Sequence, residues 1–430
     1  MKYIKEDYNN NCMAKIKEIT ASEILNAKGV PTVEATVILD DGKIGVASCP
    51  SGETIGAYEA SDLKDNDEKR FEGQGVLKAV NNIKTLIAPS MIGKDVEHQQ
   101  EIDKIMIDLD GTQNKSRLGA NAMLAVSMAV AKAGAESSAL PLFLYLRQFV
   151  NKDHGSLKVP IPIFILINGG IPEKGLAFYE FLLIPASSKP YVASLQIGKE
   201  IYQSFKKVLE AETSQTFNDY EEGFSPNLET NKEGFSLIKQ AVEGTHIRLE
   251  FDVFFGLDAK ASNFFKNGKY HIKDNPNALS SKDLINYYED LNKNIHLLYF
   301  EDSLDQDDWD GWINLSQRLS NTAIIAGGDL IATNPYRLQM ALEKKTINGI
   351  VIKPNQVATV IESLAIAEMA KETGLKIIVS HRGIETNDDF VADFSVAVAA
   401  DYIKIGSLTR GENIAKYNRL LQIENQLKIL

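Results

Sequence analysis

The chain has 430 residues, of which 44% are hydrophobic and 24% charged, a balance that is ordinary for a globular protein and excludes a disordered or fibrous chain. Acidic residues outnumber basic ones by 58 to 46, and the resulting net charge of −12 disfavours general binding to nucleic acid or to an anionic membrane. The two cysteines exclude a disulfide framework, and the polar start of the chain and the absence of a long apolar run predict a cytoplasmic protein without a membrane span.

The first 150 residues predict a polar leader over residues 1–14 and a small α+β domain over residues 15–150. β-Branched runs predict strands at 14–27 and 31–40, and Asp-Asp-Gly at 40–42 is a hairpin signal before a third strand at 43–49. Helical patterns follow at 75–87, 96–109 and 120–135. Small residues lie on several faces of the last helix, which predicts close packing against its neighbours. Strands followed by helices are typical of an α+β domain.

Residues 151–430 predict a barrel that carries the active site. Eight strand-like runs lie at 159–166, 181–185, 247–258, 295–300, 323–326, 349–352, 376–379 and 402–405. Helical patterns lie between most of them, at 191–211, 279–291, 335–345, 357–373 and 388–399. Repeated strand–helix alternation is typical of a (β/α)8 barrel, so the predicted fold class is α/β. The spacing near the first three strands is less regular, which predicts a departure from strict alternation there.

Several of the predicted barrel strands end in ionisable side chains. These are Asp258, Glu301, Asp302, Lys353, His381, Arg382 and Lys404. Because active sites of such barrels lie at the carboxyl ends of the strands, we expect these groups to share one polar site. Carboxylates on successive strands supply the oxygen ligands that Mg²⁺ prefers, and a lysine beside other cations can act as a base. The combination favours removal of a proton next to a substrate carboxylate.

Sequence motifs at these positions resemble those of the enolase (phosphopyruvate hydratase) family. The matching strings include Lys353-Pro-Asn355-Gln356, Ser380-His381-Arg382, Phe300-Glu301-Asp302, Pro50-Ser51-Gly52, Gly119-Ala-Asn121-Ala122 and Ala415-Lys416-Tyr417-Asn418. The resemblance runs in order from about residue 15 to the C-terminus. It implies an α+β domain on an eight-stranded barrel, and a hydro-lyase activity of the kind that interconverts 2-phosphoglycerate and phosphoenolpyruvate.

The resemblance implies a catalytic role for each matching residue. Lys353 matches the base that removes the carbon-bound proton. Glu221 matches the acid for the leaving hydroxyl group, with Glu222 beside it as the alternative. Glu180 matches a second catalytic carboxylate, which helps to position water. Lys404 matches the lysine that holds the substrate carboxylate near the base.

The resemblance also implies a substrate and a cofactor. His381 and Arg382 match the segment that closes on the substrate, with the Arg382 guanidinium at its phosphate. Asp258 and Glu301 match two of the three carboxylates that bind the Mg²⁺ cofactor. The expected partner is a small phosphorylated or phosphonylated carboxylic acid. A homodimer or a larger homo-oligomer is also expected, although Ser22 stands where an arginine commonly pairs across the dimer.

The sequence departs from the family pattern within the same site. Gly328 stands at the first position of an Asp-Asp pair, so only Asp329 remains there to complete the metal ligands. The loop at 171–175 lacks the family's histidine. Thr54 replaces a serine that binds a second Mg²⁺, and it keeps a hydroxyl for binding substrate or metal. Gly383 replaces a serine after the His-Arg pair.

Lys260 adds a cation near the expected metal position. It follows Asp258 by two residues, where the family usually has a small residue. The two side chains would share a face if the strand continued, whereas Lys260 would reach solvent if the strand had ended before it. Loss of an anion at Gly328 and gain of this cation predict that Mg²⁺ affinity is lowered rather than lost. Three functions stay open: ordinary enolase activity, the same chemistry on a phosphonate analogue, and a non-catalytic binding protein with the enolase fold.

Overall fold

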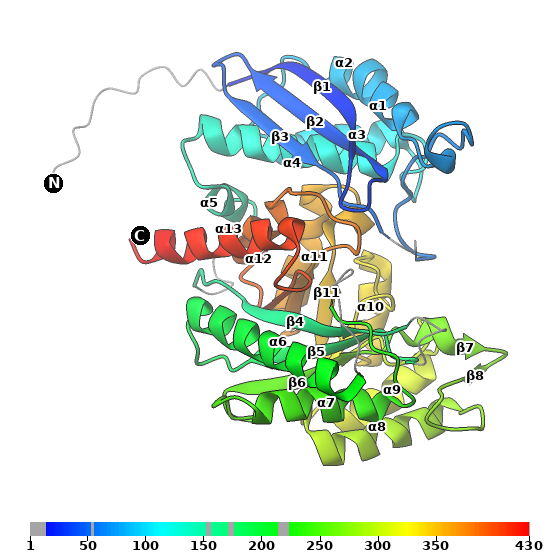
Figure 1. Cartoon of the computed structure of the whole chain (residues 1–430). Coiled ribbons are helices and arrows are strands. Elements are labelled where there is room, and N and C mark those ends of the chain that lie inside the picture. Colours follow the sequence, from blue (N-terminus) through cyan, green and yellow to red (C-terminus); the bar gives the residue numbers. More distant parts are fainter. Residues whose placement is uncertain (1–13, 53–55, 152–155, 171–175, 214–222, 430) are drawn as a thin grey trace.

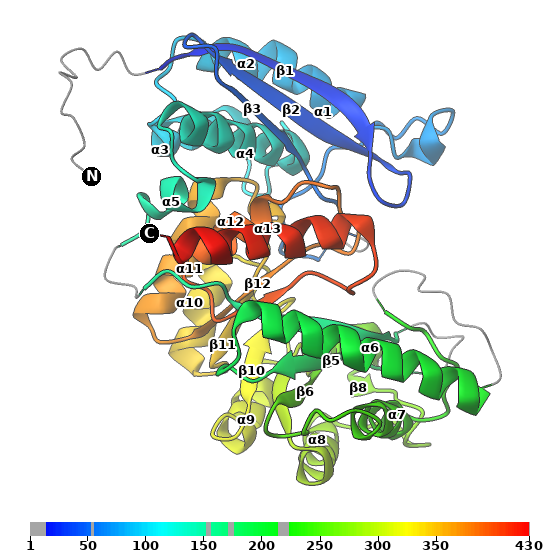
Figure 2. The same ribbon diagram turned by 60° about the vertical axis from the view of Figure 1, so that its left-hand side comes forward.

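The computed structural model describes residues 14–52, 56–151, 156–170, 176–213 and 223–429. A small sheet with its helices lies on one side of a barrel, and the two views agree that the C-terminal helix runs beside the barrel, near the junction (Figures 1 and 2). Among the described residues, no helix has both the length and the apolar character that crossing a bilayer demands.

Three antiparallel strands form the N-terminal sheet, in the order β1 (Ile16–Leu25), β2 (Pro31–Leu39) and β3 (Ile44–Ser48). The helices of this part are α1 (Leu77–Asn82), α2 (Ala88–Met91), α3 (Gln99–Asp110), α4 (Ala120–Ser137) and α5 (Leu142–Arg147). A π-helical turn, Ile83–Ile87, joins α1 to α2, and a 3-10 turn, Phe71–Gly73, precedes α1. The predicted strands and helices are therefore confirmed. A Cβ atom on Gly45 would come within 2.0 Å of the carbonyl oxygen of Ala129, so β3 packs directly on the small residues of α4.

Eight strands close the barrel. They are β4 (Ile161–Asn168), β5 (Glu180–Pro185), β6 (Val253–Asp258), β9 (Leu297–Glu301), β10 (Ile324–Gly327), β11 (Gly349–Ile352), β12 (Lys376–Ser380) and β13 (Tyr402–Lys404). β5 is antiparallel to both β4 and β6, and the other neighbours are parallel. This is the departure from strict alternation that the sequence predicted. The predicted strand at 247–258 is too long, because residues before Val253 form a turn.

Helices surround the barrel. They are α6 (Tyr191–Thr213), α7 (Asn231–Glu243), α8 (Ser281–Ile295), α9 (Trp309–Leu319), α10 (Pro335–Lys344), α11 (Val360–Glu372), α12 (Phe390–Ala397) and α13 (Gly411–Leu427). Three short elements complete the described barrel: the 3-10 turns Ala261–Phe264 and Pro354–Gln356, and the hairpin of β7 (Phe265–Lys266) and β8 (Lys269–Tyr270). α7, α9 and α13 were not predicted from the sequence.

Apolar side chains fill the barrel interior, so polar chemistry is confined to its mouth. The interior cluster contains Ile163, Ile165, Leu182, Ile184, Tyr299, Ile324, Ala326, Val351 and Ile378. Alternate residues of a strand point to opposite faces, and the intervening apolar residues pack with the larger core that includes the helices. The polar residues at the strand ends lie above this packed interior.

Helix α11 joins the barrel to the N-terminal helices. The first N–H groups of a helix have no partner within it. The N–H of Val360 donates to Oγ of Ser127 on α4 at 3.0 Å, and the N–H of Ile361 donates to Oδ2 of Asp103 on α3 at 3.0 Å. Side chains of one part of the molecule therefore cap a helix of the other.

Candidate active site

Strand register places three carboxylates side by side at the mouth of the barrel. Glu180 at the start of β5 lies opposite Asp258 at the end of β6, and Asp258 lies opposite Glu301 at the end of β9. Lys404 reaches them from β13. Its Nζ donates to Glu180 Oε2 at 2.8 Å, to Asp258 Oδ2 at 2.9 Å and to Glu301 Oε2 at 2.7 Å. All four residues are buried, so the ammonium group neutralises part of a charge cluster that is largely shielded from water.

Opposing effects set the ionisation of this cluster. Burial by itself lowers the pKa of Lys404, but the three carboxylates outweigh it and hold that pKa well above its usual range. Burial, together with the charge of Glu301, raises the pKa of Asp258 well above its usual range. Burial also disfavours ionisation of Glu301, yet the cations of Lys404 and Lys353 lower its pKa. Lys404 therefore stays an ammonium, and its charge favours the ionised form of Glu301 but does not outweigh the burial of Asp258.

The cluster forms one wall of a cleft at the mouth of the barrel. Lys353 follows β11 and lines the same cleft. Its backbone N–H donates to Thr333 Oγ1 at 3.1 Å, and that hydroxyl donates to Gln356 Oε1 at 2.6 Å. The full lining is Gly56, Glu59, Tyr179, Glu180, Asp258, Lys260, Asp302, Asp329, Lys353, Ser380, His381, Arg382, Gly383 and Lys404. The cleft thus combines the base, cation and carboxylate candidates.

Arg382 is held in the cleft by a residue that the sequence did not reveal. Its Nη2 donates to Glu59 Oε2 at 2.9 Å, and Gln356 Nε2 donates to Glu59 Oε1 at 3.1 Å. Burial opposes the charge of Arg382, but the adjacent Glu59 raises its pKa overall. A Cβ atom on Gly52 would come within 2.0 Å of Arg382 Nη2, so the guanidinium needs a glycine there. A carboxylate seven residues after Gly52 was too weak a signal to single out Glu59.

His381 lies beside Arg382 and is buried. Burial and the positive charges of Lys416 and Lys404 lower its pKa well below the usual range. Its imidazole is therefore neutral at physiological pH, and it meets a ligand as a hydrogen-bonding group rather than as a cation.

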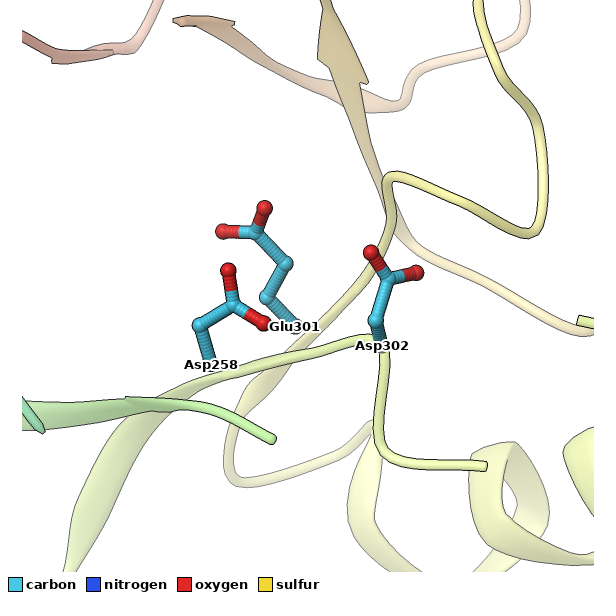
Figure 3. A group of neighbouring side chains, drawn as sticks. All are labelled: Asp258, Glu301 and Asp302. Atoms are coloured by element: carbon cyan, nitrogen blue, oxygen red, sulfur yellow. The ribbon is translucent and has the colours of Figure 1, made fainter. Parts of the chain in front are cut away.

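A group of three acidic residues could hold a metal ion. Asp258, Glu301 and Asp302 each offer an oxygen, and these atoms lie within 4.8 Å of one another (Figure 3). Glu301 Oε1 is buried and has no hydrogen-bond partner. Hard oxygen donors with an unsatisfied buried carboxylate oxygen fit Mg²⁺. Asp329, the residue expected from the sequence, lines the cleft but is not in this group.

The electrostatics of Asp302 fit a position inside an acidic cluster. Burial and the charges of Asp329 and Glu301 raise its pKa to about 7. Its carboxylate accepts backbone N–H bonds from Gly328 at 2.9 Å and from Asp329 at 2.7 Å. The sequence pattern had included Asp302 only as one of several charged strand ends.

Lys260 lines the cleft, but not for the reason that the sequence suggested. β6 ends at Asp258, and Lys260 has a left-handed φ of 45°, so the two side chains do not follow strand alternation. The Lys260 Nζ lies 4.5 Å from the centre of the Tyr179 ring. A non-glycine residue in this conformation is uncommon and is often found at functional sites.

Three of the predicted site positions lie outside the described residues. They are Thr54 and the two candidates for the general acid, Glu221 and Glu222. The loop at 171–175 also lies outside them. Of the other predicted residues, Lys353, Glu180, Lys404, His381, Arg382, Asp258 and Asp329 line the cleft, and Glu301 contacts Lys404 beneath it.

Comparison with known families matches almost the whole chain. Residues 16–146 match the enolase N-terminal domain, and residues 156–429 match the enolase C-terminal TIM barrel domain.

Proposed function

The chain belongs to the enolase family, and we propose that it is a hydro-lyase acting on a small phosphorylated carboxylic acid of the 2-phosphoglycerate type. The reaction removes a proton from the carbon beside the substrate carboxylate and eliminates water from the neighbouring carbon. The observation that carries this proposal is the meeting of Lys353, Lys404 and Glu180 in one cleft at the barrel mouth.

The two lysines suit different tasks because their surroundings differ. Lys404 is buried among three carboxylates and stays charged, which suits it to hold the substrate carboxylate and to stabilise negative charge that develops there. Lys353 is half-buried and lines the open part of the cleft, where its amine can take the proton from carbon. Glu180 lies on the wall beside them, and we propose that it orients water.

Arg382 is proposed to bind the phosphate. A guanidinium offers two parallel N–H donors, which match phosphate oxygens better than a lysine does. Glu59 fixes the direction of this group from the opposite side. Because His381 is neutral, it adds a hydrogen bond without adding charge.

The metal-binding group is proposed to lie below the substrate carboxylate. Asp258 and Glu301 would hold Mg²⁺ together with a third oxygen ligand. Mg²⁺ bound there supplies positive charge that stabilises the additional negative charge left on the substrate when its proton is removed.

The test is formation of phosphoenolpyruvate from 2-phosphoglycerate by the purified chain with Mg²⁺ present. Lys353→Ala is expected to lower turnover by about 10² to 10⁴-fold, because no other described amine occupies its place as a base. Lys344→Ala, which removes an exposed lysine on α10, is the matched control and should leave turnover unchanged. Native protein that neither turns over 2-phosphoglycerate nor exchanges its carbon-bound proton in deuterated water would contradict the proposal.

A second candidate is the same reaction on a phosphonate analogue. Lys260 supports it, because this additional cation lines the cleft in a family position that usually has a small residue. Comparing kcat/KM for 2-phosphoglycerate and for its phosphonate analogue decides between the two substrates. A higher kcat/KM for the phosphonate would favour the second candidate.

A further inference from the structure

The third oxygen ligand of the proposed metal site depends on the space beside Gly328. Gly328 follows β10, beside the strand end that carries Glu301. A Cβ atom on Gly328 would lie 2.5 Å from Asp302 Oδ2 and 3.2 Å from Glu301 Oε1. Real Cβ atoms do not approach another atom to 2.5 Å, so any larger residue would displace the Asp302 carboxylate. Asp302 therefore occupies space that a side chain at position 328 would take.

The backbone at Gly328 does not itself require glycine. Its φ is not among the positive values found in the described residues. A residue with a side chain could adopt this conformation, so it is the space beside the backbone that matters. The glycine and the placement of Asp302 are thus two parts of one arrangement.

The Asp302 carboxylate is fixed in that space. Asp302 has a left-handed φ of 43°, and its Oδ1 and Oδ2 accept the backbone N–H groups of Gly328 and Asp329. Each carboxylate oxygen can accept two bonds, and Oδ2 accepts the Asp329 N–H, so a second acceptor position remains on the atom that faces Gly328. The Asp329 N–H therefore fixes Asp302 Oδ2 and leaves it able to bind a further partner.

The second observation is the unsatisfied oxygen of Glu301. Glu301 Oε2 accepts from Lys404 at 2.7 Å and from Tyr299 at 2.7 Å. Glu301 Oε1 is fully buried, has no hydrogen-bond partner, and faces the same space beside Gly328 as Asp302 Oδ2. A buried carboxylate oxygen without a partner is unfavourable, and a cation between the two oxygens would satisfy both.

We infer that Asp302 replaces the missing ligand at position 328, so that Asp258, Glu301 and Asp302 bind Mg²⁺. The place of the ion rests on the proposed function, but its ligands are tested by binding rather than by turnover. Asp329 is half-buried and lies outside this group. It is the matched control, since it is the neighbouring aspartate that sequence reasoning favoured.

The experiment is titration of the native chain with Mg²⁺ by calorimetry and with Mn²⁺ by electron paramagnetic resonance. Asp302→Asn is expected to weaken affinity for both ions by at least ~10-fold, because loss even of a supporting group commonly has an effect of that size. Asp329→Asn is expected to keep the native affinity. Native affinity in Asp302→Asn, or an equal or larger loss in Asp329→Asn, overturns the assignment.

A rescue variant separates ligand loss from misfolding. All variants are first melted in EDTA, where the metal contributes nothing to stability. The double variant Gly328→Asp with Asp302→Ala returns a carboxylate to position 328 and removes the side chain that occupies its space, and Asp302→Ala alone is its reference. Recovered affinity in the double variant supports the inference, whereas failure to recover any affinity over Asp302→Ala overturns it.

Turnover is measured separately so that the two proposals can fail independently. If Mg²⁺ binding depends on Asp302 but the protein does not turn over 2-phosphoglycerate, the ligand assignment stands and the proposed function is contradicted. If the protein turns over 2-phosphoglycerate but its Mg²⁺ binding depends on Asp329, the proposed function stands and the assignment of Asp302 as a ligand is overturned.

Discussion

At the scale of single residues, Lys404 combines a structural role in an ion cluster with its proposed role in the reaction. Its ammonium is the shared partner of Glu180, Asp258 and Glu301. Removal of one partner from a buried ion cluster commonly destabilises a protein by about 3–5 kcal/mol. A variant at Lys404 would therefore mix loss of stability with loss of activity. Half-buried Lys353 is the cleaner position at which to test the reaction.

Arg382→Lys is expected to weaken binding of 2-phosphoglycerate by about 10-fold or more, because an ammonium cannot reproduce two parallel N–H bonds to phosphate. The matched control is Arg318→Lys, which changes an arginine paired with Glu289 on the outer helices. Calorimetry with Mg²⁺ present measures both affinities. If the two variants bind equally well, the phosphate does not contact Arg382.

Lys260→Ala tests whether the additional cation binds the substrate. A hydrogen bond to a charged group contributes about 1.5–3 kcal/mol, so affinity for the phosphorylated acid is expected to fall by about 10-fold or more. Lys266→Ala removes the same charge from an exposed site on β7 and is the control. The comparison is made at low and at high salt, since a general charge effect would be screened in both variants. Equal effects in the two variants would leave Lys260 without a specific role.

At the scale of elements, the barrel strands were predictable because buried parallel strands are short, apolar and bounded by polar residues. Helix α9 was missed because its sequence contains Gly311 and Asn314, which have low helix propensity. Its buried face, with Trp312 and Leu315, shows that tertiary packing stabilises it.

The strand-end pattern also predicted which residues share the cleft, but not the role of each residue within it. Nothing in the spacing distinguishes Asp302 from Asp329. The difference depends on the space beside Gly328 and on backbone N–H groups from a neighbouring strand end. Similarly, the direction of Lys260 depends on a left-handed residue after β6, which strand periodicity does not reveal.

The start of α11 has a titratable cap, which predicts a pH effect. Asp103 accepts from Ile361 N–H, Ser127 Oγ and Gln99 Nε2, yet burial raises its pKa to about 7. The folded protein therefore holds this proton more tightly than the unfolded chain does. The contribution of Asp103 to stability is complete below about pH 4, the ordinary pKa of aspartate, and is lost as the pH rises through 7.

Urea unfolding of native protein and Asp103→Asn at several pH values measures this effect. Asparagine cannot ionise, so the stability of Asp103→Asn relative to native protein should improve between pH 5 and pH 8, by about 3 kcal/mol. The part of the difference in unfolding free energy that does not vary with pH reflects changed hydrogen bonds and not the ionisation of Asp103. A stability difference that does not vary with pH would show that Asp103 keeps an ordinary pKa.

At the scale of the whole molecule, the site depends on both structural parts. Glu59 comes from the N-terminal segment, and it fixes Arg382, which follows a barrel strand. A bridge between Ser51 and Ile384 joins the same two segments. The alignment of Arg382, the proposed phosphate-binding group, therefore depends on the position of the N-terminal part on the barrel.

Asp388 is a charged residue of the barrel part that bonds to the N-terminal part. Both of its carboxylate oxygens accept from Lys132 on α4 at 2.9 Å, and Oδ2 also accepts the N–H of Ser48 on β3 at 3.0 Å. The Asp388 side chain is 8% exposed and that of Lys132 is 20% exposed, so water replaces little of what is lost when the pair is broken. Asp388 thus joins the barrel to both layers of the N-terminal part.

Asp388→Ala is therefore expected to lower the free energy of unfolding by about 3 kcal/mol, because it leaves a largely buried ammonium and a backbone N–H without their partner. Calorimetry should also show the N-terminal part melting before the barrel, since the lost bonds cross the junction between them. The control is Asp108→Ala, which breaks an exposed pair with Lys104 and should leave the melting profile unchanged because solvent screens such pairs. If the two variants had the same melting profile, apolar packing of α4, rather than Asp388, would hold the two parts together.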